Sequence, residues 1–283
     1  MGKIHKILFP TDFSETAQNA FCYCLLLADR FEAEIALLHV VYPEYEVMDL
    51  PVMAVKATKD KLAAARSALS SFSALGAHEV GKALSRLPVV QGDVEVGSPA
   101  GAIAKAARRE EADLIVMGTK GEHNALEYTL GSVSTGVAEH APCPVLVVPE
   151  AAAWKAIQAV AFATDLSESD PFHVWKTIQL LAPFHPIIHV VHVANGEHPR
   201  AIADMEDFFA RNTNNTEALQ ITFHELDHAS VAAGLEEFVA NHNIDLLAMY
   251  APKHSWLDRL LRQSNTRKMI FETTTPLLLL KPE

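Results

Sequence analysis

Residues 7–14, which read ILFPTDFS, decide the fold, because they recur as VAFATDLS at residues 160–167. In both stretches an apolar run ends in Thr-Asp, and Ser follows two positions later. A second match joins LLHV at residues 37–40 to VVHV at residues 190–193, with the same offset of 153 residues. Ordered matches at one offset indicate an internal repeat and hence two homologous domains.

Two further matches lie closer to the end of each copy. ADLIVM at residues 112–117 matches IDLLAM at residues 244–249, and PVLVV at 144–148 matches PLLLL at 276–280, both with an offset of 132. The second copy is therefore 21 residues shorter, and we expect the loss between its second and third strands. The sequence predicts domains at residues 1–150 and 151–283.

Each copy alternates short apolar runs with helical patterns, which is typical of parallel α/β folds. In the first copy we expect strands at 6–11, 34–41, 89–95, 114–117 and 145–148, and helices at 14–31, 59–87, 99–109 and 132–140. The prediction is two tandem open parallel five-stranded sheets with helices on both faces. The nearly continuous apolar strands fit burial on both sides.

The last strand of each copy, at residues 145–148 and 277–280, is wholly apolar. Because an uncovered apolar edge strand promotes aggregation, we expect these two strands to pack against each other as an internal pseudo-dimer. Whether two chains pair further as a homodimer stays open.

Composition narrows the classes of partner. The 283 residues are 49% hydrophobic and carry 23 basic against 35 acidic side chains, a net charge of -12. Such an acidic chain argues against nucleic-acid and anionic-membrane binding, which need basic surfaces. No apolar stretch approaches the roughly 18 residues of a membrane-spanning helix. With three cysteines and no secretory signal pattern, we expect a cytoplasmic protein.

Three segments of the first copy end at the carboxyl edge of the expected sheet, where open parallel sheets bind ligands. They are Pro10–Asp12, Val40 and Met117–Gly121, and the last leads through a loop to Gly131–Ser134 at the start of a helix. Glycines allow close approach of an anion, and a helix N-terminus offers free N–H groups. With the hydroxyls of Ser132 and Ser134, these features predict a phosphate cradle.

The spacing Gly118-x2-Gly121-x9-Gly131-Ser132 resembles the ATP-binding signature of the universal stress protein family in its tandem form. The openings at Pro10–Ser14 and Leu38–Val40 are similar to that family too. The resemblance implies a Rossmann-like, adenine nucleotide alpha hydrolase-like fold and ATP with Mg²⁺. Adenine would lie near Thr11, Asp12 and Val40, and Asp12 would act through the ribose or a metal-bound water. The implied nucleotide-binding residues are Pro10, Thr11, Asp12, Val40, Met117, Gly118, Lys120, Gly121, Gly131, Ser132, Val133 and Ser134.

Plainer interpretations of single residues remain open. Gly118 and Gly121 are also typical of a turn, Ser132 of a helix cap, and Asp12 of a cap on the following helix. Lys120 is also typical of a solvated loop lysine.

The second copy lacks the cradle. At the offset of 132, Tyr250, Lys253 and Gln263 replace the three glycines, and Pro252 removes a backbone donor. We therefore predict that this domain does not bind ATP in the same way and serves as a structural or regulatory partner. Its basic loop at residues 253–268 is either an anion contact or a solvated amphipathic helix.

The histidines of the second copy give no metal site by spacing alone. His189 and His192 point to opposite faces of a strand, and His224 and His228 share a face but lie about 13 Å apart. Partners from elsewhere in the fold stay open.

Three function classes remain: a nucleotide-dependent stress-response or regulatory module, a slow ATPase or phosphotransferase, and a nucleotide-free dimerisation scaffold. We favour the first, because the cradle has no Walker lysine, and its candidates for a general base, His123 and Glu127, lie in a loop where such residues are typically solvated. A dehydrogenase lacks support, since the glycines follow the fourth strand instead of the first. The insertion at residues 42–58 is either a lid or a contact surface.

Overall fold

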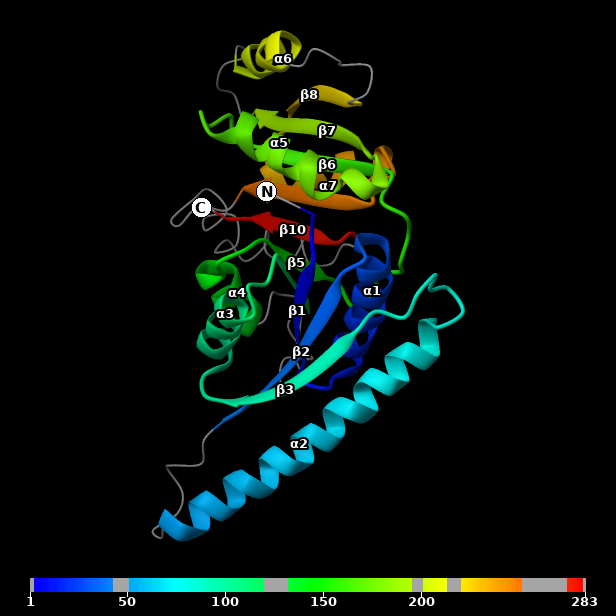
Figure 1. Ribbon diagram of the computed structural model, residues 1–283. Helices are drawn as coiled ribbons and strands as arrows, with labels where there is room; N and C mark the ends of the chain where they lie inside the picture. Colours follow the sequence, from blue (N-terminus) through cyan, green and yellow to red (C-terminus); the bar gives the residue numbers. More distant parts are fainter. Residues whose placement is uncertain are drawn as a thin grey trace. The chain divides into compact units, whose positions relative to one another are not determined.

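The computed structural model describes residues 3–42, 51–119, 132–194, 201–212, 220–250 and 274–281. The chain divides into two compact units (Figure 1): Ile4–Glu150 forms the first domain, and Ala151–Glu283 makes up almost all of the second. Both are α/β units built on a parallel sheet, which confirms the predicted fold class. No helix within these described ranges has the length and apolar character needed to cross a membrane.

The first domain alternates strands and helices in the predicted order. Its elements are β1 (Lys6–Pro10), α1 (Glu15–Phe31), β2 (Glu34–Val41), α2 (Pro51–Val80), β3 (Val90–Val96), α3 (Pro99–Arg109), β4 (Leu114–Gly118), α4 (Ser132–His140) and β5 (Val145–Val148). In Figure 1, α3 and α4 lie on one side of the sheet, and α1 and α2 lie on the other. The sheet therefore has a helix layer on each face.

The strand order of the first domain is β3-β2-β1-β4-β5, with every pair parallel. β1 lies between β2 and β4, so the chain leaves β1 toward one edge and later returns on its other side. This reversal is a topological switch point, where a crevice opens at the carboxyl ends of the strands. The crevice lies between the end of β1 and the end of β4, the two segments expected to hold a ligand.

Helix α1 begins as its sequence predicts. Ser14 caps it by accepting a hydrogen bond from the Ala17 N–H through its Oγ at 3.1 Å, and Glu15 places a negative charge in the first turn.

Beneath helix α1, Phe9 of β1 packs edge-on against Phe21 with 5.1 Å between ring centroids, and Phe72 of α2 completes the cluster. This aromatic core lies directly behind the end of β1.

Helix α2 differs from its expected bounds of 59–87, because it runs from Pro51 to Val80. Proline suits a helix start, since its missing N–H would have no partner in the first turn. The backbone leaves the helix at Gly81, and Pro88 disfavours helix at the residue before it. Much of the supposed 42–58 insertion is thus helical, while residues 43–50 lie outside the described part.

The second domain repeats the arrangement with shorter connections. Its elements are β6 (Ala159–Thr164), α5 (Asp170–Leu180), the 3-10 helix η1 (Ala182–Phe184), β7 (Ile187–Ala194), α6 (Ala201–Asn212), β8 (Ile221–Asp227), α7 (Val231–Asn241), β9 (Leu246–Tyr250) and β10 (Leu277–Leu280). Its strand order is β10-β9-β6-β7-β8, again parallel throughout. Residues 195–220 take the place of residues 42–89, so the length difference falls where the repeat predicts.

An aspartate before the fourth strand clamps the first strand in both domains. Asp113 Oδ2 accepts hydrogen bonds from the backbone N–H groups of His5 and Lys6 at 2.7 and 3.0 Å. Asp245 Oδ2 does the same for Gln158 and Ala159 at 2.9 and 3.1 Å. The repeat therefore preserves a side-chain contact that fixes the register between two strands distant in sequence.

All three cysteines are free thiols. Burial raises the pKa of Cys24, which is fully enclosed, and raises that of Cys143 to about 12. For Cys22, burial together with a hydrogen bond to Glu79 Oε2 at 2.9 Å also raises the pKa to about 12.

Candidate functional site

The end of β1 forms a tight loop held by its own side chains. Thr11 is buried, its N–H donates to Leu38 O at 2.8 Å, and its Oγ1 accepts from the Phe13 N–H at 3.0 Å. Asp12 Oδ1 accepts from both the N–H and the hydroxyl of Ser14, at 3.1 and 2.7 Å. Asp12 thus binds the residue that caps α1, and its carboxylate stays at the carboxyl edge of the sheet.

A strained residue follows. Phe13 has a φ of 67°, in the left-handed region that costs a non-glycine residue about 1–3 kcal/mol and is concentrated at functional sites. Its ring stacks on His39 of β2, with 4.4 Å between centroids and 28° between planes. His39 Nδ1 lies 2.8 Å from Thr11 O; because a carbonyl only accepts, Nδ1 carries the proton. His39 therefore holds the strained turn at two points, the Phe13 ring and the Thr11 carbonyl.

The end of β4 approaches the start of α4. Met117 and Thr119 are buried, and Gly118 O accepts a hydrogen bond from Ser134 Oγ at 3.1 Å. A Cβ built on Gly118 would lie 3.2 Å from Thr16 Cγ2, tighter than most real contacts. Position 118 accordingly suits glycine, and Ser134 joins the two halves of the expected cradle.

The structure describes most of the predicted site and brings its described parts to one edge of the sheet. Val40 lies near the end of β2, half-buried, and pairs in register with Glu95. The site residues in the described ranges are Pro10, Thr11, Asp12, Val40, Met117, Gly118, Ser132, Val133 and Ser134. Lys120, Gly121 and Gly131 lie outside those ranges.

One expected role changes. The sequence predicts hydroxyl donors at Ser132 and Ser134, but the Ser134 proton is donated to Gly118 O, and the side chain is only 4% exposed. Because this buried hydroxyl already donates to the backbone, its role is to hold the start of α4 against the end of β4. Sequence could not show this, because the partner is a carbonyl 16 positions away.

The corresponding edge of the second domain is filled by its own side chains. The buried carboxylate of Asp170 accepts a hydrogen bond from Thr164 Oγ1 and a second from Ser167 Oγ at 2.8 Å. Burial, followed by the charge of Asp170, raises the pKa of Asp165. Position 170 corresponds to Ala17 in the first domain, so sequence comparison around the glycines alone missed this carboxylate.

Tyr250, which replaces Gly118, stacks on the buried ring of His173 with 3.5 Å between centroids and 15° between planes. The strand end that carries no side chain at Gly118 in the first domain is therefore covered by two rings in the second. The basic loop at 253–268 that follows lies outside the described residues.

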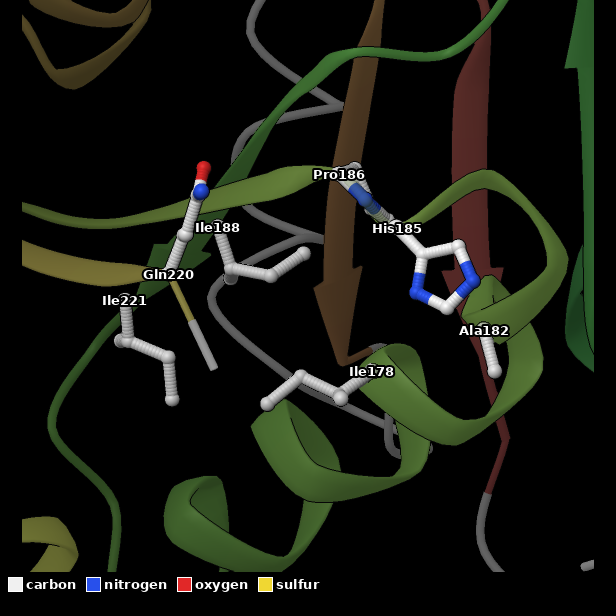
Figure 2. A pocket seen from close by; sticks show the side chains of 7 residues that line it. All are labelled: Ile178, Ala182, His185, Pro186, Ile188, Gln220 and Ile221. Atoms are coloured by element: carbon white, nitrogen blue, oxygen red, sulfur yellow. The ribbon is translucent and has the colours of Figure 1, made fainter. Parts of the chain in front are cut away.

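A hollow in the second domain lies at the opposite edge of its sheet (Figure 2). Its walls include residues just before β7 and β8, so it opens at the amino-terminal ends of these strands. At about 160 Å³ it is below the roughly 300–1,000 Å³ of small-molecule sites. It is lined by Ile178, Ala182, His185, Pro186, Ile188, Gln220 and Ile221.

The contact between His39 and Thr11 has a measurable consequence. We expect His39→Leu to lower the free energy of unfolding of the first domain by about 1–2 kcal/mol, because a backbone carbonyl loses its donor beside a strained turn. His39→Asn should recover part of this, since its Nδ2 occupies nearly the place of Nδ1. Denaturant titration checks both variants.

The second domain supplies the matched control. His192 Nδ1 lies 3.1 Å from Thr164 O, and Leu166 has a φ of 62°. His192→Leu should therefore destabilise the second domain and leave the first unchanged. Equal stability of His39→Leu and wild type would show that this hydrogen bond is dispensable.

This parallel α/β fold, with a switch point at β1 and a helix layer on each face of the sheet, defines a duplicated domain of the doubly wound α/β class. The family model described as the universal stress protein family matches residues 3–149 and again 156–281, and the chain belongs to that family. Universal stress protein MJ0577 of Methanocaldococcus jannaschii is 32% identical over 152 residues, covering 50% of this chain and 93% of the relative.

Two solved structures match nearly the whole chain. A universal stress protein from Archaeoglobus fulgidus DSM 4304 has a TM-score of 0.66 at 18% identity and covers 98% of this chain and 96% of its own. A structure from Pseudomonas aeruginosa UCBPP-PA14 has a TM-score of 0.58 at 16% identity, with coverages of 99% and 94%. These likenesses show that the tandem fold is shared.

Proposed function

We propose that the first domain binds ATP in the crevice between the ends of β1 and β4, and that occupancy makes the protein a nucleotide-dependent stress-response module. The observation that carries this is the hydrogen bond from Ser134 to Gly118 O, which holds the first turn of α4 against the end of β4. Free N–H groups at a helix start and a nearby glycine favour a phosphate.

The phosphates would lie along Met117, Gly118 and the first turn of α4. Backbone N–H groups of Ser132, Val133 and Ser134 belong to the turn whose donors have no partner within a helix. The sequence adds Lys120, Gly121 and Gly131 to this wall as part of the proposal.

The adenine and ribose would lie on the β1–β2 side. Pro10, Thr11 and Val40 provide backbone at two adjacent strand ends, already ordered by the Thr11 N–H to Leu38 O hydrogen bond. A base can be recognised there by backbone groups, while the Asp12 carboxylate is at hand for ribose hydroxyls or a metal-bound water. Binding to a preformed loop avoids the cost of ordering it.

Mg²⁺ would enter with the nucleotide. This ion is usually held by one or two carboxylates and by substrate phosphates. Among the residues that the structure describes, no group of three or more His, Cys, Asp or Glu side chains is arranged to hold a metal by itself. Within the described ranges, Asp12 is the carboxylate at the first-domain site, so the proposal gives the ion phosphate ligands and this carboxylate, directly or through water.

The second domain is proposed to bind no ATP and to act as a structural or regulatory partner, with the apolar last strands of the two domains paired. Support comes from the stacked rings of Tyr250 and His173 and from the Asp170 carboxylate, which places a negative charge where the first domain has an alanine. A phosphate would meet both a filled space and a like charge.

Calorimetric titration of the apo protein with ATP and Mg²⁺ tests the proposal. We expect one ATP per chain. Two per chain would disprove the assignment of the second domain, and no binding would leave the scaffold class as the better interpretation. Repeating the titration in EDTA measures how much of the affinity depends on Mg²⁺.

A further inference from the structure

Three histidines of the second domain meet on one face of its sheet, although their sequence positions did not predict this. His189 lies on β7, His224 on β8, and His242 directly after α7. Their ring centroids are 5.3 to 5.8 Å apart. We call His189, His224 and His242 the histidine cluster. The missed signal was cross-strand register, because His189 pairs with Thr222 and this brings His224 alongside.

A hydrogen-bonded triangle joins two members of the cluster. His189 Nδ1 lies 3.2 Å from His224 Nε2, and Thr222 Oγ1 lies 2.8 Å from each nitrogen. When both of these nitrogens carry protons, two N–H donors face each other across 3.2 Å, and when both rings are doubly protonated, two positive charges do so as well. The triangle therefore fits a state in which at least one ring is neutral.

Helix α7 closes the cluster from the other side. The Phe238 ring stacks on His242 at 3.9 Å and meets His224 edge-on at 4.9 Å. His242 Nδ1 donates to Phe238 O at 3.1 Å, which fixes the third ring at the end of the helix. The rings thus connect edge strand β8 to α7 and β7.

The surroundings disfavour protonation. Burial, followed by the charges of His224 and His242, lowers the pKa of His189 below its ordinary 6.5. Burial and the charge of His242 lower that of His224. Among the residues that the structure describes, the charges that lower these two pKa values come from β8 and from the residue after α7, and both are imidazoles of the cluster.

We propose that the histidine cluster is an acid-sensitive latch, in which protonation drives the imidazoles apart and loosens β8 and α7 from the second domain. The unfolded chain binds protons at a higher pH than the folded cluster does. The latch therefore contributes fully above pH 6.5, and its contribution is lost as the pH falls through the lower folded values. This gives the second domain a response to acid that needs no nucleotide.

The test uses the full chain in EDTA-containing buffer. Histidine ring resonances followed by NMR should show midpoints below 6.5 for His189 and His224. Hydrogen-exchange protection of residues 221–227 and 231–241, corrected for intrinsic rates, should fall between pH 7.5 and 5.5. The fall is at most about tenfold for each histidine, because pH 5.5 lies one unit below the ordinary histidine pKa of 6.5. Midpoints at or above 6.5, or constant protection, would overturn the proposal.

Two variants locate the effect. His189→Gln, His224→Gln keeps polar side chains but removes the titrating pair, so its protection should change less than twofold over the same range. His185→Asn, at an exposed histidine outside the cluster, should respond like wild type. Full pH dependence in the double variant, or a wild-type response that occurs only in buffer without EDTA, would contradict a proton-driven latch. If the double variant does not fold, the wild-type midpoints still decide the question.

Discussion

The Gly118→Tyr, Gly131→Gln variant is expected to lose ATP binding by at least about a hundredfold, which corresponds to about 3 kcal/mol. At position 118 even a Cβ lies 3.2 Å from Thr16 Cγ2, so a tyrosine ring must displace Thr16 or extend into the crevice. The change copies two of the three glycine replacements that the second domain carries. Titration calorimetry with ATP and Mg²⁺ measures the loss.

Gly101→Ala is the matched control, because a Cβ at this helical position has no heavy atom within 4 Å. It should bind ATP like wild type. An unchanged affinity in the double variant, with its circular dichroism intact, would show that the phosphates do not lie between β4 and α4.

The second large effect concerns stability. We expect Phe9→Ala to lower the free energy of unfolding of the first domain by about 3–5 kcal/mol, because this fully buried ring supports Phe21 and the end of β1. Phe162, its equally buried counterpart in the repeat, should give a loss of similar size in the second domain. Scanning calorimetry of both variants assigns the two transitions.

ATP then distinguishes the domains. A ligand at a hundredfold excess over its Kd stabilises the state that binds it by about 2.7 kcal/mol. ATP with Mg²⁺ should raise the transition that Phe9→Ala lowers and leave the transition lowered by Phe162→Ala in place. Equal shifts of both thermal transitions would mean that both domains bind the nucleotide or that the two domains unfold as one unit.

The strands, and the carboxyl edge at which they end, were predictable from sequence because their signals are local or repeated. Apolar runs such as Leu114–Met117 and Val145–Val148 became strands, and Ser14 capped its helix. The duplicated strand ends gave the carboxyl edge as the candidate site. The start of α2 was not predicted, because the expected helix began at residue 59 and left residues 51–58 in the insertion, although a proline such as Pro51 suits a first helical turn.

The remaining features depend on contacts between distant segments. The histidine cluster needs the register of β7 against β8, and the stacking of Tyr250 on His173 needs β9 beside α5. Neither follows from spacing along one element. The Ser134 hydroxyl likewise takes its role from a carbonyl on another element. The pairing of the two last strands stays a prediction.

The three thiols described earlier have a practical consequence. The thiolate is the nucleophile that attacks alkylating and oxidising reagents, and raised pKa values leave almost none of it at neutral pH. The native chain thus offers a quiet background for site-directed labelling. A cysteine placed on an exposed position of each domain, such as Lys105 in the first, would take up a fluorophore or spin label in preference to the native thiols. Distances between the two domains can then be measured without removing any native cysteine.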